Sequence, residues 1–461
     1  MIPSPLGWLG IVRLGLVQTA LGAVVVLTTS TLNRVMVVEL QLAALLPGLL
    51  VALHYAVQIT RPRWGYGSDM GGRRTPWIVG GMAVLSLGGF LAALATVWMG
   101  TNLAAGIALA TLAFVMIGTG VGAAGTSLLV LLAKRVIPER RSAAATIVWV
   151  MMLVGFIVTA GLAGHFLDPF SSERLVTVAG AVSACALLIA LFAVWGVEDA
   201  GTAHAAPAPI SQPQNEPSAA KPPFAKALAE IWAEPDARNF TVFIFVSMLA
   251  YSAQDLILEP FAGTVFAYTP GESTKLASVQ HGGVLIGMVL IGTLATAVGG
   301  RWFGSLRGWM VFGCAASAAA LLALAIGGHA APDWPLRASV LLLGFANGAF
   351  AVAAIGSMMA LAGAGREKRE GVRMGLWGAA QAIAFGLGGF LGAASVDLMR
   401  FLTGDALTAY STVFACEAFL FLAAAYFALG LGQSRASRGL NAAPRVLAIG
   451  ENMLPAGARD R

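Results

Sequence analysis

Charged side chains are scarce in this chain of 461 residues. Asp, Glu, Lys and Arg make up 11% of it, whereas hydrophobic residues make up 58% and the mean hydropathy is +0.81. A water-soluble protein of this length cannot hide so large an apolar surface, so the composition excludes a soluble globular protein. It indicates a protein whose solvent is the lipid bilayer.

Cysteine and the residue clusters of enzyme active sites are scarce too. The three cysteines all fall inside apolar segments, where we expect them to pack rather than to form disulfides. The sequence has no metal-ligand cluster, no nucleophile triad and no phosphate-binding loop. It also lacks the basic region and cleavage site of a signal peptide, so we expect the first apolar segment to be retained. We therefore predict no enzyme activity, no metal and no tightly bound cofactor.

Long apolar runs dominate the rest of the chain. A helix needs about 20 apolar residues to cross a bilayer, and these runs are continuous rather than alternating, which favours helices over strands. The sequence predicts an all-α integral membrane protein with twelve transmembrane helices. We place these at residues 10–31, 41–59, 77–98, 104–132, 143–165, 174–197, 240–267, 276–298, 309–327, 336–362, 374–398 and 408–431.

One long polar stretch divides the twelve segments six and six. It is rich in proline between residues 207 and 223, which is typical of an extended linker. Within it, residues 224–234 are predicted to form a short amphipathic helix on the membrane surface. The predicted parts are an N-terminal six-helix half over 1–197, a linker over 198–239, a C-terminal six-helix half over 240–431 and a basic tail over 432–461.

Basic residues are distributed unevenly between the two predicted sides of the membrane. With the N-terminus in the cytoplasm, 23 of the 28 Lys and Arg residues fall on the cytoplasmic side. Cytoplasmic loops of membrane proteins carry such an excess. The net charge of +6 and the pI of about 9.5 therefore indicate topology rather than nucleic-acid binding. We predict that both termini are cytoplasmic and expect no nucleic-acid partner.

The loop between the second and third apolar segments carries a spaced motif. It fits the pattern G-x-x-x-D-x-x-G-R-R with Gly65, Asp69, Gly72, Arg73 and Arg74. This spacing resembles the loop between helices 2 and 3 of the major facilitator superfamily, a fold of two six-helix halves that serves many functions. An acidic side chain beside arginines can pair across the turn and complement a helix dipole. We interpret the motif as a structural clasp, with direct substrate contact as the alternative.

The motif departs from its superfamily pattern in two ways. Met70 stands where a basic residue is usual, which argues against the gating form of the loop. The second half holds only a partial copy without an acidic residue, made of Gly299, Gly300, Arg301 and Arg307. The fifth segment also lacks the Gly-Pro signature of proton-coupled drug antiporters, which counts against an exporter.

Few ionisable residues lie within the apolar segments, and each is costly in a bilayer. Arg34 and Glu39 flank the first predicted extracytoplasmic turn and can pair with each other. Asp255 and Glu259 lie four residues apart, so they share one helix face and could form a proton or cation site. Because Pro260 predicts that the helix bends or ends nearby, the alternative is that both carboxylates face water or Arg34.

Three histidines lie in or near the predicted spans. A neutral imidazole can ligate the magnesium of a chlorin, and a flat pigment also needs a small residue one helical turn away. His165 has Gly161 and His281 has Ala277 at that position, whereas His54 has a bulkier residue. All three are possible pigment contacts, and we hypothesise that His54 or His281 touches pigment. Packing of a hydrogen-bonded imidazole is the alternative interpretation for each.

Three stretches are similar to the PucC/LhaA family, a branch of the major facilitator superfamily from photosynthetic bacteria. They are TLNRVMVVEL (Thr31–Leu40), the segment Leu53–Leu85 with the loop motif, and QDLILEPFAG (Gln254–Gly263). The resemblance implies an inner, intracytoplasmic photosynthetic membrane protein that helps to assemble a light-harvesting antenna. Its implied partners are antenna polypeptides, bacteriochlorophyll synthase and bacteriochlorophyll, the last bound transiently.

The resemblance also suggests a role for the buried polar residues. An assembly factor needs a lipid-facing groove for antenna helices and pigment rather than a polar path through its centre. We hypothesise that an extracytoplasmic polar cluster fixes the contact between helices 1 and 7, where the two halves meet. Its members are Arg34, Glu39, Gln254, Asp255 and Glu259.

Two other functions are weighed against assembly. A secondary transporter of a tetrapyrrole or small amphiphile would need a coupling ion, for which Asp255 and Glu259 are the plausible carboxylates. The other polar residues of the spans, Asn347 and Glu417, are expected to make hydrogen bonds between helices instead. One clade of the family is labelled a bacteriochlorophyll synthase chain, but the Asp-rich diphosphate-binding motif of a prenyltransferase is missing here. A synthase activity is therefore not expected.

Overall fold

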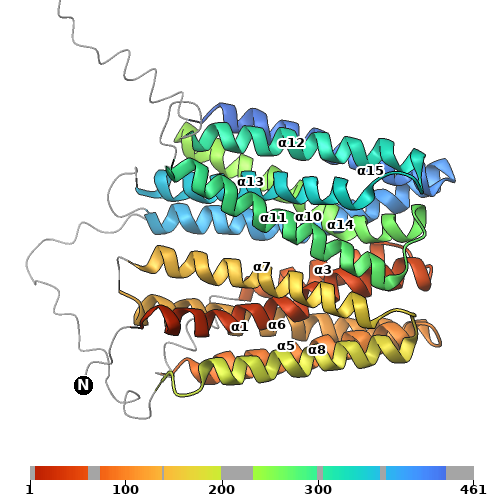
Figure 1. Ribbon diagram of the computed structural model, residues 1–461, viewed down its shortest axis with the longest axis horizontal. Helices are drawn as coiled ribbons and strands as arrows, with labels where there is room; N and C mark the ends of the chain where they lie inside the picture. Colours follow the sequence, from red (N-terminus) through yellow and green to blue (C-terminus); the bar gives the residue numbers. More distant parts are fainter. Residues whose placement is uncertain are drawn as a thin grey trace, which may run out of the picture.

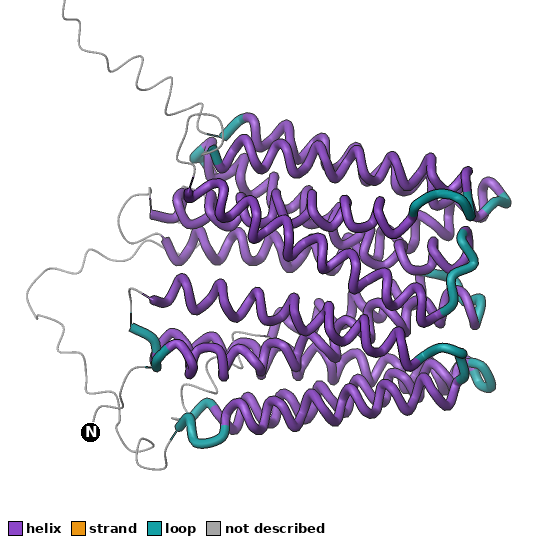
Figure 2. The backbone as a smooth tube through the Cα atoms, viewed as in Figure 1, coloured by secondary structure: helices purple, strands orange, loops and turns teal. Residues whose placement is uncertain are grey.

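The computed structural model describes residues 6–60, 73–137, 140–198, 232–297, 305–363 and 370–431. Within these ranges the chain is helical, and Figure 2 shows helices joined by loops with no strand. The predicted all-α fold is confirmed. The motif residues Gly65, Asp69 and Gly72 lie outside the described residues, as does most of the amphipathic helix predicted over 224–234.

Each predicted apolar segment contains one main helix, and all but the second are long. The helices after the first are α3 (Leu45–Val57), α5 (Thr75–Met99), α6 (Leu103–Arg135), α7 (Arg141–Phe166), α8 (Ser172–Val194), α10 (Pro235–Val265), α11 (Pro270–Ala297), α12 (Leu306–Gly327), α13 (Leu336–Gly363), α14 (Glu370–Thr403) and α15 (Ala406–Leu429). Short 3₁₀ turns follow α3 (Gln58–Thr60) and α12 (Gly328–Ala330).

The first helix is longer than predicted. It was expected to end near residue 31 but runs unbroken from Trp8 to Glu39. It begins as α1 (Trp8–Val26) and continues through a π-helical turn (Leu27–Thr31), α2 (Leu32–Arg34) and a second π-helical turn (Val35–Glu39). The extension places Arg34 inside the helix rather than beside a turn.

Threonine hydroxyls support the first π-helical turn. Thr28 donates to the carbonyls of Val24 and Val25 at 3.1 and 2.9 Å, and Thr29 donates to Val25 at 3.0 Å. A π-helical turn shifts the hydrogen-bond ladder by one residue and disturbs the pairing of carbonyls beside it. The hydroxyls supply additional donors at this point, so the wider turn leaves less unsatisfied backbone in an apolar setting.

The second segment gives a shorter helix than predicted. Eleven described helices are long and apolar enough to cross a membrane, and α3, with 13 residues, is the shorter twelfth. It begins late because an irregular turn follows the first helix, with Gln41 at a φ of 52°. Pro47 then lies in the first turn of α3, where its missing N–H costs no helical hydrogen bond.

The helices pack into two bundles. Buried apolar side chains of α1 to α8 form one cluster, which also takes in Leu256 of α10, and those of α10 to α15 form a second. Figure 1 shows the first bundle in red to yellow below the second in green to blue. The first helix, α3 and α7 contact α10, α11 and α14 across the boundary, which we call the seam.

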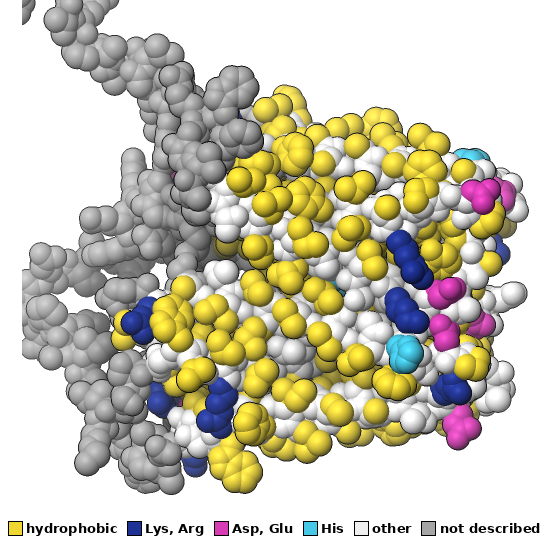
Figure 3. Space-filling view, in the orientation of Figure 1, with side chains coloured by type: hydrophobic (Ala, Val, Ile, Leu, Met, Phe, Trp, Pro, Cys, Tyr) yellow, Lys and Arg dark blue, Asp and Glu magenta, His cyan; other side chains and the backbone are white. Residues whose placement is uncertain are grey.

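The two ends of the double bundle differ in which helix ends and connections lie there. At the linker end, on the left in Figure 1, α1 and α10 begin and α8 and α15 end. At the turn end, on the right, short turns join the first helix to α3 and α10 to α11. Apolar side chains cover the flank between the ends, and charged side chains gather toward both ends (Figure 3). This is the surface of a multi-span membrane protein.

Candidate functional site

Arg34 is the best-buried cation of the seam. Its side chain is only 3% exposed, although it was expected to border a turn. One guanidinium nitrogen donates to the Glu39 carboxylate, and Nη2 donates to the carbonyl of Tyr268, which follows α10, at 2.6 Å. Gly263 makes room for it, since a Cβ there would lie 3.0 Å from Nη2. Arg34 therefore ties the first helix to the end of α10.

Pro260 creates an acceptor that the first helix uses. The proline lies inside α10, which continues past it to Val265. Because proline has no N–H, the carbonyl four residues before it, that of Leu256, loses its helical donor. Asn33 donates its side-chain Nδ2 to this carbonyl at 2.6 Å. Asn33 of one half thus donates a hydrogen bond across the seam to the Leu256 carbonyl that Pro260 leaves free in the other half.

Glu259 and Asp255 share a helix face but have different partners. Ser30 of the first helix donates to Oε1 of Glu259, whose Oε2 has no partner in the part of the chain described. Gln280 of α11 donates to Oδ1 of Asp255 at 2.9 Å. Glu259 is buried and Asp255 half-buried. Of the alternative that both carboxylates face water or Arg34, facing water does not hold for Glu259, whereas Glu259 does interact electrostatically with Arg34. Glu259 belongs to the seam, whereas the Asp255 contact lies within the second bundle.

Further polar groups are buried in the second bundle. Gln254 is fully buried, and neither atom of its amide has a hydrogen-bond partner among the described residues. The same is true of both carboxylate oxygens of Glu417, which is 2% exposed on α15. Asn347 accepts a hydrogen bond from Ser317 at 2.9 Å, as expected for a helix-to-helix contact. The hydrogen bond expected for Glu417 is not seen within these ranges.

Other contacts close the turn end of the seam, and the sequence did not predict them. Asp397 of α14 accepts from the backbone N–H groups of Ala44 and Leu45, at 3.0 and 2.7 Å, and so caps the start of α3. The remaining contacts join Thr31 to Thr274 (3.0 Å), Ser278 to the carbonyl of Ile157 (2.9 Å), the N–H of Gly271 to Asp168 (3.2 Å) and Lys275 to Asp168 (4.0 Å).

These seam contacts share one location. Every hydrogen bond or ion pair described between the two bundles lies in the half of the seam nearer the turn end. Two sequence signals could have found part of it, because Asn33 falls in TLNRVMVVEL and Pro260 in QDLILEPFAG. Nothing in the sequence pairs Asp397 with the start of α3, since only folding brings them together.

The three histidines lie in different surroundings. His54 is buried, and its Nε2 lies 3.0 Å from the amide nitrogen of Gln58. His281 is buried against Phe156, with ring centroids 4.8 Å apart. His165 is exposed near the turn end of α7, beside the exposed Phe166. A ligand in the bilayer can therefore reach His165 directly, whereas protein encloses the other two.

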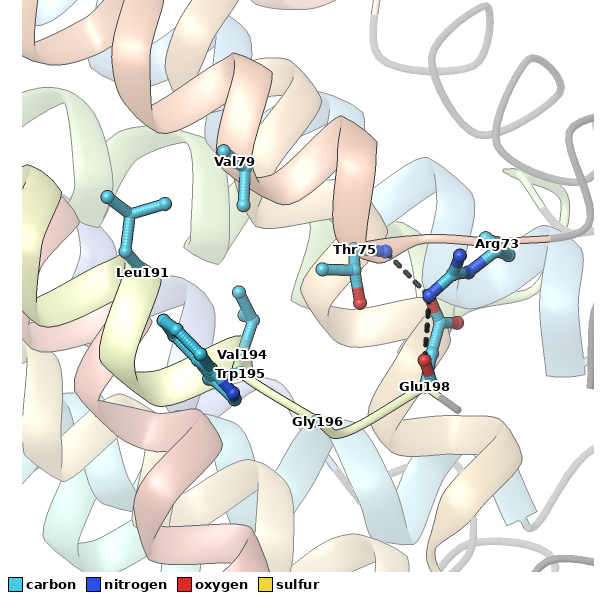
Figure 4. Close-up of a pocket in the computed structure, with 8 residues that line it drawn as sticks. All are labelled: Arg73, Thr75, Val79, Leu191, Val194, Trp195, Gly196 and Glu198. Carbon is cyan, nitrogen blue, oxygen red and sulfur yellow. Dashed lines mark hydrogen bonds between the residues drawn. The ribbon is translucent and has the colours of Figure 1, made fainter. Parts of the chain in front are cut away.

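The described part of the loop motif holds the first bundle together at the linker end. Arg73 donates through Nη2 to the carbonyl of Glu198 at 2.8 Å, just after α8. The Glu198 carboxylate accepts from the backbone N–H groups of Arg74 and Thr75 at 2.7 and 2.8 Å, and so caps α5. The contacts of Arg73 and Thr75 with Glu198 are drawn in Figure 4. Figure 4 shows these groups beside a pocket between the ends of α5 and α8.

The second bundle repeats this arrangement in part. Arg307, at the start of α12, donates to the carbonyl of Leu431 at 2.9 Å, just after α15. In each half, an arginine at the start of the third span thus binds a carbonyl just after the end of the sixth. The other residues of the predicted second copy, Gly299, Gly300 and Arg301, lie outside the described residues. The contact makes the internal repeat clearer than the motif does.

Comparison with known sequences places these features in a family context. The family described as PUCC protein matches residues 31–436. The chain is 54% identical to the bacteriochlorophyll synthase 44.5 kDa chain of Rhodobacter capsulatus, over 96% of this chain and 99% of the relative. It is 31% identical to protein PucC of Cereibacter sphaeroides, over 89% of this chain and 90% of the relative.

Solved structures with a similar fold are transporters. The nucleoside transporter NupG aligns with a TM-score of 0.62 at 15% identity, over 91% of this chain and 98% of its own. A bacterial homologue of the lysosomal transporter Spinster, in an inward-facing, occupied conformation, aligns with a TM-score of 0.61 at 16% identity, over 94% and 96%. At these identities the likeness establishes the major facilitator fold and no more.

Proposed function

Because the chain belongs to the PUCC family, we propose that it is an assembly factor for a bacterial light-harvesting antenna complex. In this role it helps antenna polypeptides to insert into the intracytoplasmic photosynthetic membrane and hands bacteriochlorophyll to them. The observation that carries the proposal is the 54% identity, over nearly the whole chain, to a relative named for bacteriochlorophyll synthesis.

The seam is compatible with this role. Ser30, Asn33 and Arg34 each donate a hydrogen bond to the second bundle, so these groups hold helices together rather than line a path. The outer faces of the long helices are apolar and open to lipid. A factor that meets antenna helices and pigment within the bilayer needs such outer faces more than a polar centre.

We assign the pigment contact to His165 among the three candidate histidines. It is the exposed one, with Leu162 and Phe166 exposed beside it and Gly161 one turn away on α7. An imidazole in this position can ligate the central magnesium of a chlorin that lies along the helix, with an apolar wall beside the ring. Binding there is transient, because the pigment has to leave for an antenna polypeptide.

The synthase name of one relative fits an accessory role better than catalysis. A prenyltransferase holds a diphosphate through an Asp-rich motif, and this sequence has none. We propose that the chain acts beside bacteriochlorophyll synthase as the recipient of finished pigment and is not itself an enzyme.

Near-infrared absorption of membranes from a deletion strain tests the assembly role. We expect one antenna band to disappear while bacteriochlorophyll synthesis and reaction-centre bands persist. The wild-type gene should restore the band. Normal antenna bands in the deletion strain would reject the proposal, and loss of all bacteriochlorophyll would point to synthesis instead.

Pigment binding is tested on protein purified in mild detergent from pigment-producing cells. The wild type should retain chlorin absorption, His165→Phe should lose most of it, and the buried-site controls His54→Gln and His281→Gln should keep it. Wild-type protein that never retains chlorin would contradict the pigment role. Equal retention by His165→Phe would contradict the assignment to this residue.

Secondary transport of a tetrapyrrole or small amphiphile is the second candidate function. The observation that favours it is the group of buried polar side chains in the second bundle, including Gln254, Glu259 and Glu417, which have unpartnered atoms within the described ranges. Buried carboxylates in a membrane are often coupling sites. Proton-gradient-driven uptake of a tetrapyrrole into proteoliposomes, lost in Glu417→Gln, would support transport and weaken the assembly account.

A further inference from the structure

A pocket of about 270 Å³ opens between the linker ends of α5 and α8. The residues that shape its two sides are Arg73, Thr75, Val79, Leu191, Trp195 and Glu198. Figure 4 shows Val79, Leu191 and Trp195 on one side of this space and Thr75, Arg73 and Glu198 on the other. An apolar wall facing a polar rim is the lining that suits an amphiphile.

The apolar wall continues along α8 into the membrane. Trp195 is 78% exposed, and Leu188, Leu191 and Phe192 are exposed on the preceding turns of the same helix. Tryptophan prefers the boundary between hydrocarbon and headgroups. The position of Trp195 therefore sets the pocket at headgroup depth, with an apolar surface below it for a chain of methylene groups.

The polar rim has hydrogen-bonding capacity to spare. Thr75 lines the pocket beside Glu198 (Figure 4), and its buried hydroxyl oxygen has no partner in the part of the chain described. The Nε of Arg73 has no partner there either, while its Nη2 is bound to the Glu198 carbonyl. A buried hydroxyl without a partner is costly, so a ligand that meets it gains a hydrogen bond at little expense.

The charge around the end of α8 is positive. Arg13 donates to the carbonyls of Phe192 and Trp195, and Arg135 donates to the carbonyl of Val197 at 2.8 Å. With Arg73, three guanidinium groups surround this segment. The described carboxylate beside them, that of Glu198, is already engaged with the N-terminus of α5. An anionic group at the rim would meet Arg73, the guanidinium that lines the pocket, with Arg13 and Arg135 on the neighbouring carbonyls of the same segment.

We propose that this pocket binds the anionic headgroup of a phospholipid from the leaflet at the linker end. The phosphate lies at the rim, within reach of Arg73 and Thr75, and an acyl chain follows the exposed side of α8 past Trp195. Arginine matches phosphate in geometry and charge. A bound lipid would bridge α5 and α8 and reinforce the clasp that Glu198 makes. The proposal stands apart from the antenna role and does not depend on it.

Fluorescence quenching tests the site on the full chain in detergent micelles. Phosphatidylglycerol with bromine atoms near the top of its acyl chains quenches nearby tryptophan, and the component lost in Trp195→Phe reports on this pocket. We expect saturable quenching of that component. We expect roughly fivefold weaker apparent binding in Thr75→Val, which removes one hydrogen bond while keeping the shape.

Matched controls separate a lipid site from other causes. Arg400→Gln and Thr403→Val alter exposed side chains at the turn end and should leave the binding curve unchanged. Brominated phosphatidylcholine should quench Trp195 far less, and inorganic phosphate should not displace phosphatidylglycerol. Equal quenching by both lipids would overturn the proposal, as would unchanged binding in Thr75→Val. Competition by free phosphate would show a phosphate site without lipid and would also overturn it.

Discussion

The two ends of the protein are held together in different ways. At the turn end, polar side chains of one bundle bind the other, as in the contacts of Asn33 with Leu256 and of Arg34 with Tyr268. At the linker end, the described polar contacts stay within each bundle, as in those of Arg73 with Glu198 and of Arg307 with Leu431.

The difference indicates how the bundles can move relative to each other. Separation at the turn end would break every described hydrogen bond and ion pair of the seam. Separation at the linker end would break none of them, because each described hydrogen bond there joins two segments of the same bundle. In this structure the described polar contacts close the seam at its turn end, and opening at the linker end would leave those contacts intact.

Among the changes that test this difference between the two ends, Arg34→Ala is expected to reduce stability most. It removes two hydrogen bonds of a buried guanidinium and leaves the Tyr268 carbonyl without a donor. We expect a loss of roughly 2–4 kcal/mol in unfolding free energy and a fall in antenna yield. Unfolding in detergent and membrane absorption spectra measure the two effects.

Arg174→Ala is the matched control for this substitution. Arg174 also lies at the turn end, but it is exposed, and among the described residues its side chain donates to the carbonyl of Pro169 in the preceding turn. Its removal should change stability by less than about 0.5 kcal/mol. Normal protein level and normal antenna yield in Arg34→Ala would show that the seam cluster has no role.

Asn33→Leu should be the next most damaging change. It leaves the Leu256 carbonyl unsatisfied in an apolar setting, and we expect a loss of about 1–3 kcal/mol. Adding Pro260→Ala should recover much of it, because an alanine N–H at this position can bind the same carbonyl within α10. Thermal unfolding of the two single variants and the double variant measures the coupling between the sites.

One outcome of this double-mutant comparison would contradict the link between Asn33 and Pro260. If Pro260→Ala and Asn33→Leu lose stability additively, the proline does not free the carbonyl that Asn33 binds. The seam would then rest on its other contacts, and the link between the two sequence motifs would have to be given up.

Glu198→Ala tests the linker end, with a smaller expected effect. It removes the cap of α5 and should cost roughly 1–2 kcal/mol. The Glu198 contacts lie within the first bundle, so their loss should not disturb the seam. In a protein with Thr31→Cys and Thr274→Cys, the disulfide between these two positions across the seam should therefore form as readily with Glu198→Ala as without it. Glu173→Ala, at an exposed acidic position in the first turn of α8, is the control. Loss of seam cross-linking in Glu198→Ala would show that the two ends are coupled.

The smallest expected change in stability comes from acidification, which acts on the Asp405 cap at the start of α15. Hydrogen bonds from the Thr408 side chain and backbone lower the pKa of Asp405 below its ordinary value of 3.8. A lowered pKa means that the cap contributes stability above 3.8 and loses it as the pH falls through the folded value. Asp405→Asn keeps the cap geometry without this titration. The difference in melting temperature between the two proteins should therefore shrink in acid, and a constant difference would contradict the role of the charge.

The sequence predicted the fold far better than the site. Apolar runs and charge asymmetry predict the spans because a bilayer requires continuous apolar helices, and eleven of the twelve segments became full-length helices. Span ends were less accurate. The first helix continues through Arg34 because that guanidinium finds acceptors in Glu39 and Tyr268, and the sequence shows only that a charge interrupts an apolar run.

Folding brings together only some members of the predicted polar cluster. Arg34, Glu39 and Glu259 do lie at the seam, whereas Asp255 turns to Gln280 within the second bundle and Gln254 is buried without a described partner. Helix periodicity places Asp255 and Glu259 on one face, but it does not say which neighbouring helix meets each turn of that face.

The sequence by itself determined that this chain is a twelve-segment membrane protein of the PUCC family, because continuous apolar runs of about 20 residues predict membrane-spanning helices and the family motifs are local in the chain. Tertiary structure alone decided which polar groups meet. Asn33 and Pro260 are more than two hundred residues apart, as are Ser30 and Glu259, and Asp397 caps a helix from the other half of the chain. Each of these groups would be costly alone in an apolar interior, so the fold is the arrangement in which they satisfy one another.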